Sequence, residues 1–218
     1  MVDFVYNMVY IVIIIKKRSI SMKKRILGIT ENLIIASLII TLMLGVGKEI
    51  KAAIFSSGFS TGKLTYIAES GSDSTIAANA ASVWNGTSSK VSITRYTGSD
   101  PYGIAASITF SCDKYAPPVS GGLGLTVPYK SYSLTSATED TNPYSGSTWV
   151  KAFCYQYKST SFTNNTQRTA TAAHEAGHAL SIEHPDATNT TALMRQGIKN
   201  STSLSSYDTS NLIAKWGK

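Results

Sequence analysis

The feature that most constrains this chain is the grouping of its histidines. All three histidines of the 218-residue sequence, His174, His178 and His184, lie in the stretch HEAGHALSIEH, and Glu175 directly follows the first. On a helix, residues four positions apart lie on the same face, so His174 and His178 can present their imidazoles to one ion. Glu175 is rotated by about 100° from His174, which places it beside such an ion. The spacing predicts a helix that carries metal ligands.

A third ligand has to come from outside the H-E-x-x-H pattern, because a catalytic zinc takes three protein ligands and keeps a fourth position for water. One class of zinc protease uses a glutamate on a second helix, but the only glutamate after His178 is Glu183, which is too close in sequence. His184 is the better candidate, since a neutral imidazole suits zinc and its spacing fits a sharp turn after the helix. Glu175 would serve as general base towards a zinc-activated water. The competing interpretation, histidines that face solvent or satisfy core hydrogen bonds, is disfavoured by the complete pattern.

Three segments widen this pattern into a family resemblance: TAAHEAGHALSIEHP, TALMRQG and LSSYDTSNLIAKWG. They resemble the active-site helix, the Met-turn and the C-terminal helix of a metzincin, most closely those of the matrixins, the matrix-metalloproteinase-type catalytic domains found also in bacteria. The resemblance runs from about Phe59 to Gly217 and is strongest towards the C-terminus. It implies a zinc-dependent endopeptidase with zinc ligands His174, His178 and His184, general base Glu175, Met194 in the turn beneath the metal, and Asp208 early in the last helix.

Two departures from the family pattern bear on the site. Ser181 stands where the turn between the second and third histidines has glycine, and Arg195 and Gln196 follow Met194 where matrixins usually show Tyr-Pro. We expect Ser181 to adopt a positive φ at a cost of roughly 1 kcal/mol, which a zinc site worth about 10 kcal/mol or more can hold in place. Glycine at this position should then raise the melting temperature by a few degrees. The lack of a tyrosine two residues after Met194 argues against the astacin-like branch.

The remaining pattern predicts an α+β domain. One helical stretch, which starts near Asp73 and stops before Gly86, lies among strand-forming stretches that precede the metal helix. The metzincin resemblance implies their arrangement: a twisted five-stranded, mostly parallel sheet with one antiparallel edge strand, an active-site helix and a C-terminal helix. Helix starts are expected at Asn164 and Ser205, each with a capping-box partner three residues later. The predicted strands are Lys63–Glu69, Val91–Thr97, Ile104–Ser111, Gly122–Tyr129 and Ser147–Tyr157.

Two stretches are candidates for the walls of a substrate cleft. The segment GGLGLTVPYK can act as an edge strand to which an extended peptide adds by main-chain hydrogen bonds. It can equally be a plain edge strand that its glycines and Pro128 keep from further pairing, and both interpretations stay open. By the family resemblance, the stretch RQGIKNSTS after Met194 should wall the pocket for the side chain that follows the cleaved bond.

The positive charge of the chain is concentrated at its N-terminus. The formal net charge is +7, but residues 1–52 carry eight Lys and Arg against three Asp and Glu, and the remainder carries 12 against 10. The high pI therefore belongs to the first segment, and we expect no nucleic-acid partner.

That first segment, residues 1–52, is typical of an export leader. The charged stretch Met22–Arg25 precedes the apolar run Leu33–Val46, whose length suits a signal peptide and is short for a membrane span. We expect translation to start at Met22, with residues 1–21 a mis-assigned extension, and a secreted catalytic domain to comprise residues 53–218. The alternative is a membrane anchor over Ile26–Val46 that holds the domain outside the cell, so any membrane contact is expected through the leader alone.

Three further points concern partners and covalent structure. Cys112 and Cys154 can form one disulfide or remain buried thiols, and their spacing does not choose. Zinc is the expected catalytic cofactor, and calcium is a second candidate for which the sequence has no clear motif. We expect a monomer that acts on protein or peptide substrates. The alternative is a catalytically weak protein of the same fold that binds a peptide or a surface protein at the edge strand.

Overall fold

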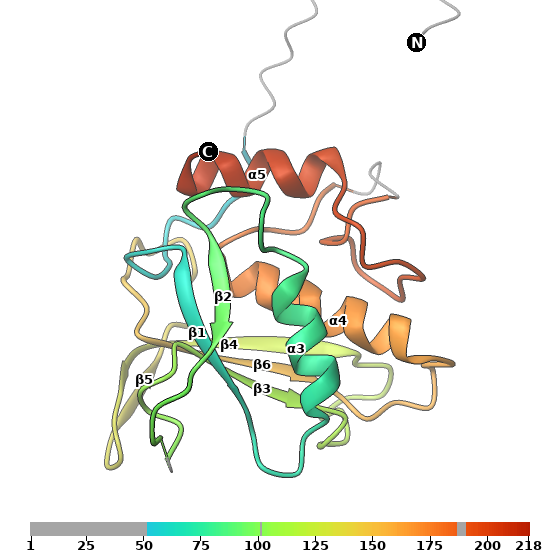
Figure 1. Ribbon diagram of the computed structural model, residues 1–218, viewed down its shortest axis with the longest axis horizontal. Helices are drawn as coiled ribbons and strands as arrows, with labels where there is room; N and C mark the ends of the chain where they lie inside the picture. The colour runs from blue at the N-terminus through green and yellow to red at the C-terminus, as the bar shows by residue number, and fades with distance from the viewer. Residues whose placement is uncertain (1–51, 101, 187–190) are drawn as a thin grey trace, which may run out of the picture. The chain divides into compact units, whose positions relative to one another are not determined.

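The computed structural model describes residues 52–100, 102–186 and 191–218, and the expectations about the leader lie outside this part except at Ala52 (Figure 1). The described residues form a mixed sheet and three helices, which confirms the predicted α+β class. The strands are β1 (Lys63–Ala68), β2 (Ser92–Arg95), β3 (Ile108–Cys112), β4 (Gly124–Tyr132), β5 (Ala137–Glu139) and β6 (Lys151–Gln156). The helices are α3 (Ser74–Ser82), α4 (Asn165–Ala179) and α5 (Ser206–Trp216).

The sheet has six strands in the order β2-β1-β3-β6-β4-β5, one more than expected. Neighbours pair in parallel from β2 to β6, whereas β4 runs antiparallel to both β6 and β5. The additional strand, β5, is three exposed residues of sequence ATE, which has no apolar alternation to mark it as a strand. It pairs with β4 only from Tyr129 to Tyr132. The predicted antiparallel edge strand is therefore an edge along its first half alone.

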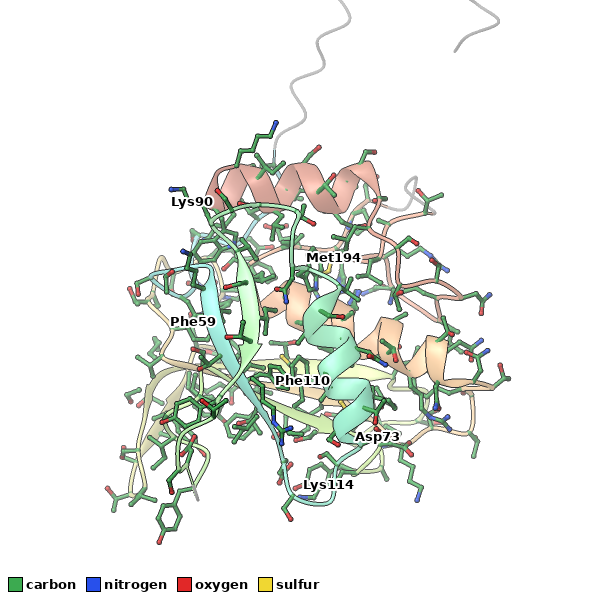
Figure 2. All side chains as sticks on the ribbon, viewed as in Figure 1. Phe59, Asp73, Lys90, Phe110, Lys114 and Met194 are labelled. Carbon is green, nitrogen blue, oxygen red and sulfur yellow. The ribbon has the colours of Figure 1, made fainter. Side chains whose placement is uncertain are left out.

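The core lies between this sheet and the helices α3 and α4. All five residues of β3 are buried, including Phe110, as is typical of a strand covered on both faces (Figure 2). Helix α3 starts at Asp73, whose carboxylate accepts hydrogen bonds from the first-turn amides of the helix. The two helices are joined where Trp84, fully buried after α3, donates its indole N–H to Ala173 O of α4 at 2.8 Å. This contact fixes α4, the helix that carries the first two histidines, against the core.

The helix starts predicted at Asn164 and Ser205 are confirmed, but only one has the complete capping box. Ser205 and Asp208 make both reciprocal hydrogen bonds at the start of α5. At the start of α4, Asn164 Oδ1 accepts from Gln167 N at 3.0 Å. The Gln167 side chain reaches one residue further back than predicted and accepts from Thr163 N at 2.7 Å. The cap thus includes the residue before the N-cap.

Both cysteines are free, fully buried thiols, so the disulfide alternative is not realised in this structure. Cys112 lies on β3 and Cys154 on β6, and burial raises the pKa of the Cys112 thiol to about 12. Among the described residues, no helix is both long and apolar enough to span a bilayer.

Candidate metal centre

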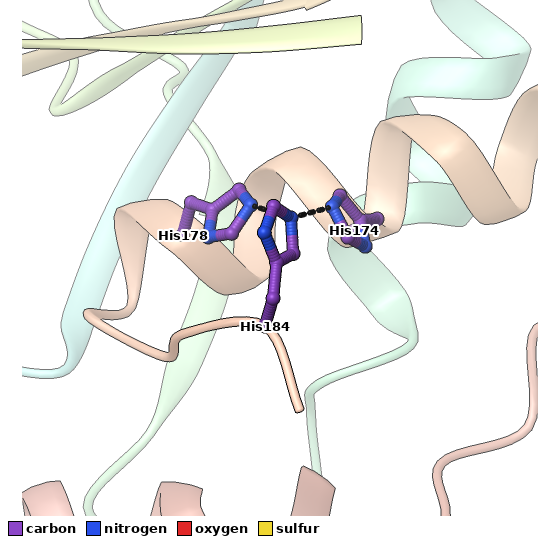
Figure 3. A group of neighbouring side chains, drawn as sticks. All are labelled: His174, His178 and His184. Atoms are coloured by element: carbon purple, nitrogen blue, oxygen red, sulfur yellow. Dashed lines mark hydrogen bonds between the residues drawn. The ribbon is translucent and has the colours of Figure 1, made fainter. Parts of the chain in front are cut away.

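The three histidines converge at the end of α4. His184 Nε2 lies 3.0 Å from His174 Nε2 and 3.0 Å from His178 Nε2, so its ring stands between the other two (Figure 3). One nitrogen from each ring lies within 4.8 Å of the others. Ligands held about 2.05 Å from a tetrahedral zinc are about 3.3 Å apart, which is close to these separations. The sequence prediction that His184 joins the other two histidines in space agrees with the structure.

Second hydrogen bonds orient the first two rings for metal binding. His174 Nδ1 lies 2.9 Å from Leu193 O, and His178 Nδ1 lies 2.8 Å from Ile182 O. A carbonyl oxygen only accepts, so each Nδ1 carries the proton and each Nε2 presents a bare lone pair. A single Nε2–H on His184 can donate to only one of these lone pairs. A cation among the three nitrogens satisfies all of them, so the donor set fits a metal ion such as zinc.

Burial keeps these imidazoles neutral, which is the form that binds metal. Desolvation lowers the pKa of His178 to about 3 and that of His174 well below its usual value, and it also lowers the pKa of His184. Lys199 adds a smaller repulsion that acts in the same direction on all three histidines. The uncharged rings are therefore ready to act as ligands across the physiological range.

Ser181 takes the left-handed conformation expected at the turn, with φ of 66°. The helix ends in a Schellman motif, in which Ile182 N donates to Gly177 O at 3.0 Å and Ser181 N donates to His178 O at 2.9 Å. This turn reverses the chain and brings His184 back over the helix. Serine thus adopts the left-handed conformation for which glycine is the usual residue at the end of such a helix.

A glycine on another segment compensates for the serine side chain. Ser181 is fully buried, and its hydroxyl donates to Ser57 O at 2.9 Å. A Cβ at Gly58 would collide with Ser181 Oγ, and it would lie 3.4 Å from Lys215 Nζ. The side chain absent from Gly58 therefore makes room for the side chain present at Ser181.

Glu175 lies beside the histidines, as its position on the helix requires. Glu175 is 5 % exposed, and the Thr126 hydroxyl of β4 lies 2.8 Å from its Oε2. Burial raises the pKa of Glu175 to about 7, against the opposing effects of the Thr126 hydroxyl and the Lys199 charge. A Cβ at Gly124 would lie 2.5 Å from Glu175 Oε1, so glycine lets the carboxylate lie against the strand. The group is thus poised to exchange a proton near neutral pH.

Met194 and Asp208 hold in place the segments that surround the histidines. Met194 is fully buried, and a Cβ at Gly177 would collide with its sulfur, so the helix and the turn can only pack this closely through glycine. Asp208 Oδ2 accepts from Leu193 N at 2.8 Å, and Oδ1 accepts from Met194 N at 3.1 Å. Because Leu193 O is the acceptor for His174, Asp208 positions a metal-ligand partner through one peptide unit.

The histidines line a cleft of about 720 Å³. The first half of β4, which β5 does not cover, also lines this cleft. β5 covers β4 only beyond Pro128, so no strand in the described part pairs with the outer edge of Gly124–Val127. By the alternation of an antiparallel pair, Gly124 and Thr126 direct their main-chain N–H and C=O groups away from β6. The segment predicted as a second wall does line the cleft, through Gln196, Gly197 and Lys199. Thr171 of α4, which the sequence did not single out, also lines it.

No protein-family model matches this sequence, and a search of curated proteins finds no relative. The fold and the site by themselves define a mixed α/β domain with a three-histidine group, on a helix and the turn beyond it, that could hold a metal ion such as zinc.

Proposed function

We propose that the chain is a zinc-dependent endopeptidase of the matrixin type within the metzincins. Three observations in one place support this function. The imidazoles of His174, His178 and His184 direct lone pairs to a common point, a buried carboxylate stands beside them, and an unpaired strand edge borders the same cleft. The first of these carries the proposal, because one N–H on His184 can satisfy only one of the two neighbouring lone pairs, whereas a cation satisfies all three nitrogens.

The strand edge gives a peptide substrate its orientation. An extended peptide that adds to Gly124–Val127 by main-chain hydrogen bonds runs past Glu175 and the histidines. A zinc ion held by the three imidazoles would supply Lewis acidity, which lowers the pKa of a water and polarises the substrate carbonyl. Thr126 holds Glu175 Oε2, while Oε1 lies at the strand edge beside Gly124. Glu175 accepts a proton from the attacking water and returns it to the leaving amine nitrogen.

Removal of the base without loss of the ligands tests these roles. The Glu175→Gln protein should retain about one zinc per chain and cleave denatured protein substrates roughly 10²–10⁴-fold more slowly. His184→Ala should lose zinc affinity together with activity, and a chelator followed by added zinc should abolish and then restore wild-type cleavage. Metal content by mass spectrometry and cleavage of unfolded protein are the two measurements.

The opposite pattern has a clear meaning. Loss of zinc from Glu175→Gln, with activity kept in His184→Ala, would reverse the assignment of ligand and base. Zinc-loaded wild-type protein that binds peptides but cleaves none would identify the chain as a peptide-binding module of this fold.

The proposal includes export of the domain after removal of residues 1–52. Support comes from the residues that follow that boundary, since Ala53 N donates to Asn211 Oδ1 at 2.8 Å and Ala53 O accepts from Glu183 N at 3.0 Å. Ala53 is thus held by hydrogen bonds to α5 and to the segment after α4. N-terminal sequencing of released protein from a chain that begins at Met22 should give a start near Ala53. Recovery only in membranes with residues 1–21 attached would favour an anchored form.

A further inference from the structure

One cationic side chain in the cleft has little to neutralise it. Lys199 is 5 % exposed, and its Nζ donates to Gly197 O, only two residues away, at 2.9 Å. An ammonium can donate three hydrogen bonds. Among the described residues, no carboxylate lies within ion-pair distance of Lys199. A charge buried this deeply with so few partners is costly unless a ligand completes its coordination.

A second polar group on the cleft wall is also without a partner. Thr171 lies on α4 one turn before His174 and is 2 % exposed, and its hydroxyl makes no hydrogen bond. Threonine in a helix usually bonds the carbonyl of the preceding turn. Thr171 and Lys199 line the same cleft as Glu175 and the histidines. Two unsatisfied donors near the reacting groups indicate a polar ligand with acceptor oxygens.

We infer that Lys199 and Thr171 bind a substrate carboxylate next to the peptide bond that is cleaved. The inference rests on the proposed peptidase function and adds a specificity to it. A carboxylate has two acceptor oxygens, so it can take one hydrogen bond from the ammonium and one from the hydroxyl. An aliphatic side chain in the same place leaves the Thr171 hydroxyl unpaired and the Lys199 ammonium with its bond to Gly197 O alone, which disfavours that side chain.

The charges that line the cleft favour the binding of a substrate carboxylate near Lys199. Four carboxylates also line the cleft, those of Glu139, Asp140, Glu175 and Glu183, and Lys199 is the one lysine or arginine among its described lining residues. Asp140 is already occupied, since Trp149 Nε1 donates to it at 2.7 Å. The remaining carboxylates repel an acidic substrate group, so the Lys199 end is the favoured place for it.

The same chemistry can come from two sources. One is the side chain of an aspartate or glutamate beside the cleaved bond, as in an endopeptidase with acidic specificity. The other is the terminal carboxylate of a peptide, which would make the protein a carboxypeptidase. Both place a carboxylate against Lys199, and a suitable peptide set separates them.

The test uses quenched fluorescent peptides that differ at one position next to the cleaved bond. One series carries Glu, Gln or Leu on either side of the bond, and a second ends shortly after the bond in a free carboxylate or an amide. A charge-assisted hydrogen bond predicts kcat/KM for Glu roughly 10- to 100-fold above Gln in the wild-type protein. Lys199→Met should bring that ratio near one, Lys199→Arg should keep most of it, and Thr171→Val should reduce it a few-fold. Lys63→Met, which removes an exposed lysine outside the cleft, should leave it unchanged.

Each other result has a defined meaning. A wild-type Glu-to-Gln ratio near or below one overturns the inference while the peptidase function stands. If Lys199→Met slows all peptides equally and shifts the pH profile, Lys199 acts through Glu175 and the inference also fails. If no peptide is cleaved, the proposed function fails, and fluorescence anisotropy of the same peptides on zinc-loaded Glu175→Gln protein still decides whether carboxylate is preferred. A preference confined to the free-carboxylate peptides assigns the site to the chain terminus.

Discussion

Lys151 and Lys199 are both buried ammonium groups, and they differ in what surrounds them. Burial lowers the pKa of each to about 8, so both pay a similar cost for leaving water. Lys151 donates to Gly103 O and, at 2.8 Å, to Ala106 O. In the described part of the chain, Lys199 Nζ donates only to Gly197 O. Burial of a charge is therefore not itself a sign of function. Lys199 differs from Lys151 because it is incompletely coordinated and lines a cleft.

The partners of Lys151 belong to one loop, between β2 and β3. Asp100 accepts the amides of three residues of this loop at 2.7–3.1 Å. Lys151 binds carbonyls of the same loop from the other side, and its ammonium lies 5.4 Å from the ring centre of Phe153. Carbonyls and amides of one turn are thus satisfied by two side chains of opposite charge. Lys151 closes a loop, whereas Lys199 lines the cleft.

The largest predicted effect is a loss of stability when Lys151 is replaced. Lys151→Met leaves the buried Ala106 carbonyl and the partly buried Gly103 carbonyl without this donor, and the relief of a buried charge offsets this only in part. We expect a loss of about 2–3 kcal/mol in the free energy of unfolding and a melting temperature lower by about 5–10 °C. Calorimetry of the zinc-loaded protein measures both. A smaller loss than that of Lys199→Met would show that the two lysines do not differ in this way.

A smaller effect on the melting temperature is expected from a change at Ser181. Its hydroxyl shares a carbonyl acceptor with a third lysine, Lys215. Its Nζ donates to Phe55 O at 2.7 Å and to Ser57 O at 3.1 Å, and Ser57 O accepts from the Ser181 hydroxyl as well. Because Lys215 keeps Ser57 O paired, Ser181→Gly relieves about 1 kcal/mol of strain and loses about 1 kcal/mol of hydrogen bond. The melting temperature should therefore stay within about 2 °C of wild type.

An almost unchanged melting temperature for Ser181→Gly replaces the rise of a few degrees that the sequence alone predicts. Ser181→Ala is the matched control, since it keeps the strained Cβ and loses the hydrogen bond, and it should melt below both glycine and serine. A rise of more than about 4 °C for Ser181→Gly would mean that the Ser57 contact contributes nothing.

The smallest predicted change in stability belongs to Lys199→Met. Removal of an incompletely paired buried charge should leave the melting temperature equal to wild type or slightly higher near pH 7. The pKa of Lys199 is about 8 in the folded protein, below the usual lysine value of 10.5. Between these values the unfolded chain binds more protons, so this lysine makes wild-type stability rise with pH. The advantage of the variant should therefore shrink towards pH 10. Equilibrium unfolding at several pH values checks it, and an advantage that grows with pH contradicts it.

Local signals in the sequence predicted the parts of the structure that depend on local chemistry. The histidine spacing, the starts of α4 and α5, and the positive φ of Ser181 each follow from a few neighbouring residues. The class of the fold and all five predicted strands also follow from short patterns, although β6 begins four residues later than expected, at Lys151, and so does β3, at Ile108. There, the loop held by Asp100 replaces the first residues of the predicted strand.

Features that depend on contacts between distant segments could not be predicted. The burial of Lys151 arises from a loop that lies before it in the chain, and Lys199 lines a cleft together with residues of α4 and β4. The pairing of Ser181 with Gly58 joins residues more than a hundred positions apart. Lysine is the residue least expected inside a domain, so composition and periodicity alone place both lysines on the surface.

Asp208 has a consequence for the order in which the site is made. Its carboxylate holds Leu193 N and Met194 N, and Leu193 O in turn orients His174. A ribosome releases the three histidines before it releases Asp208, so the ligands exist in the nascent chain before the group that aligns them. Until α5 folds back, Asp208 does not yet hold the peptide unit whose carbonyl orients His174, whereas the partner of His178, Ile182 O, lies in the turn directly after α4. The alignment of His174 for any metal bound by the three histidines is thereby tied to the completion of α5.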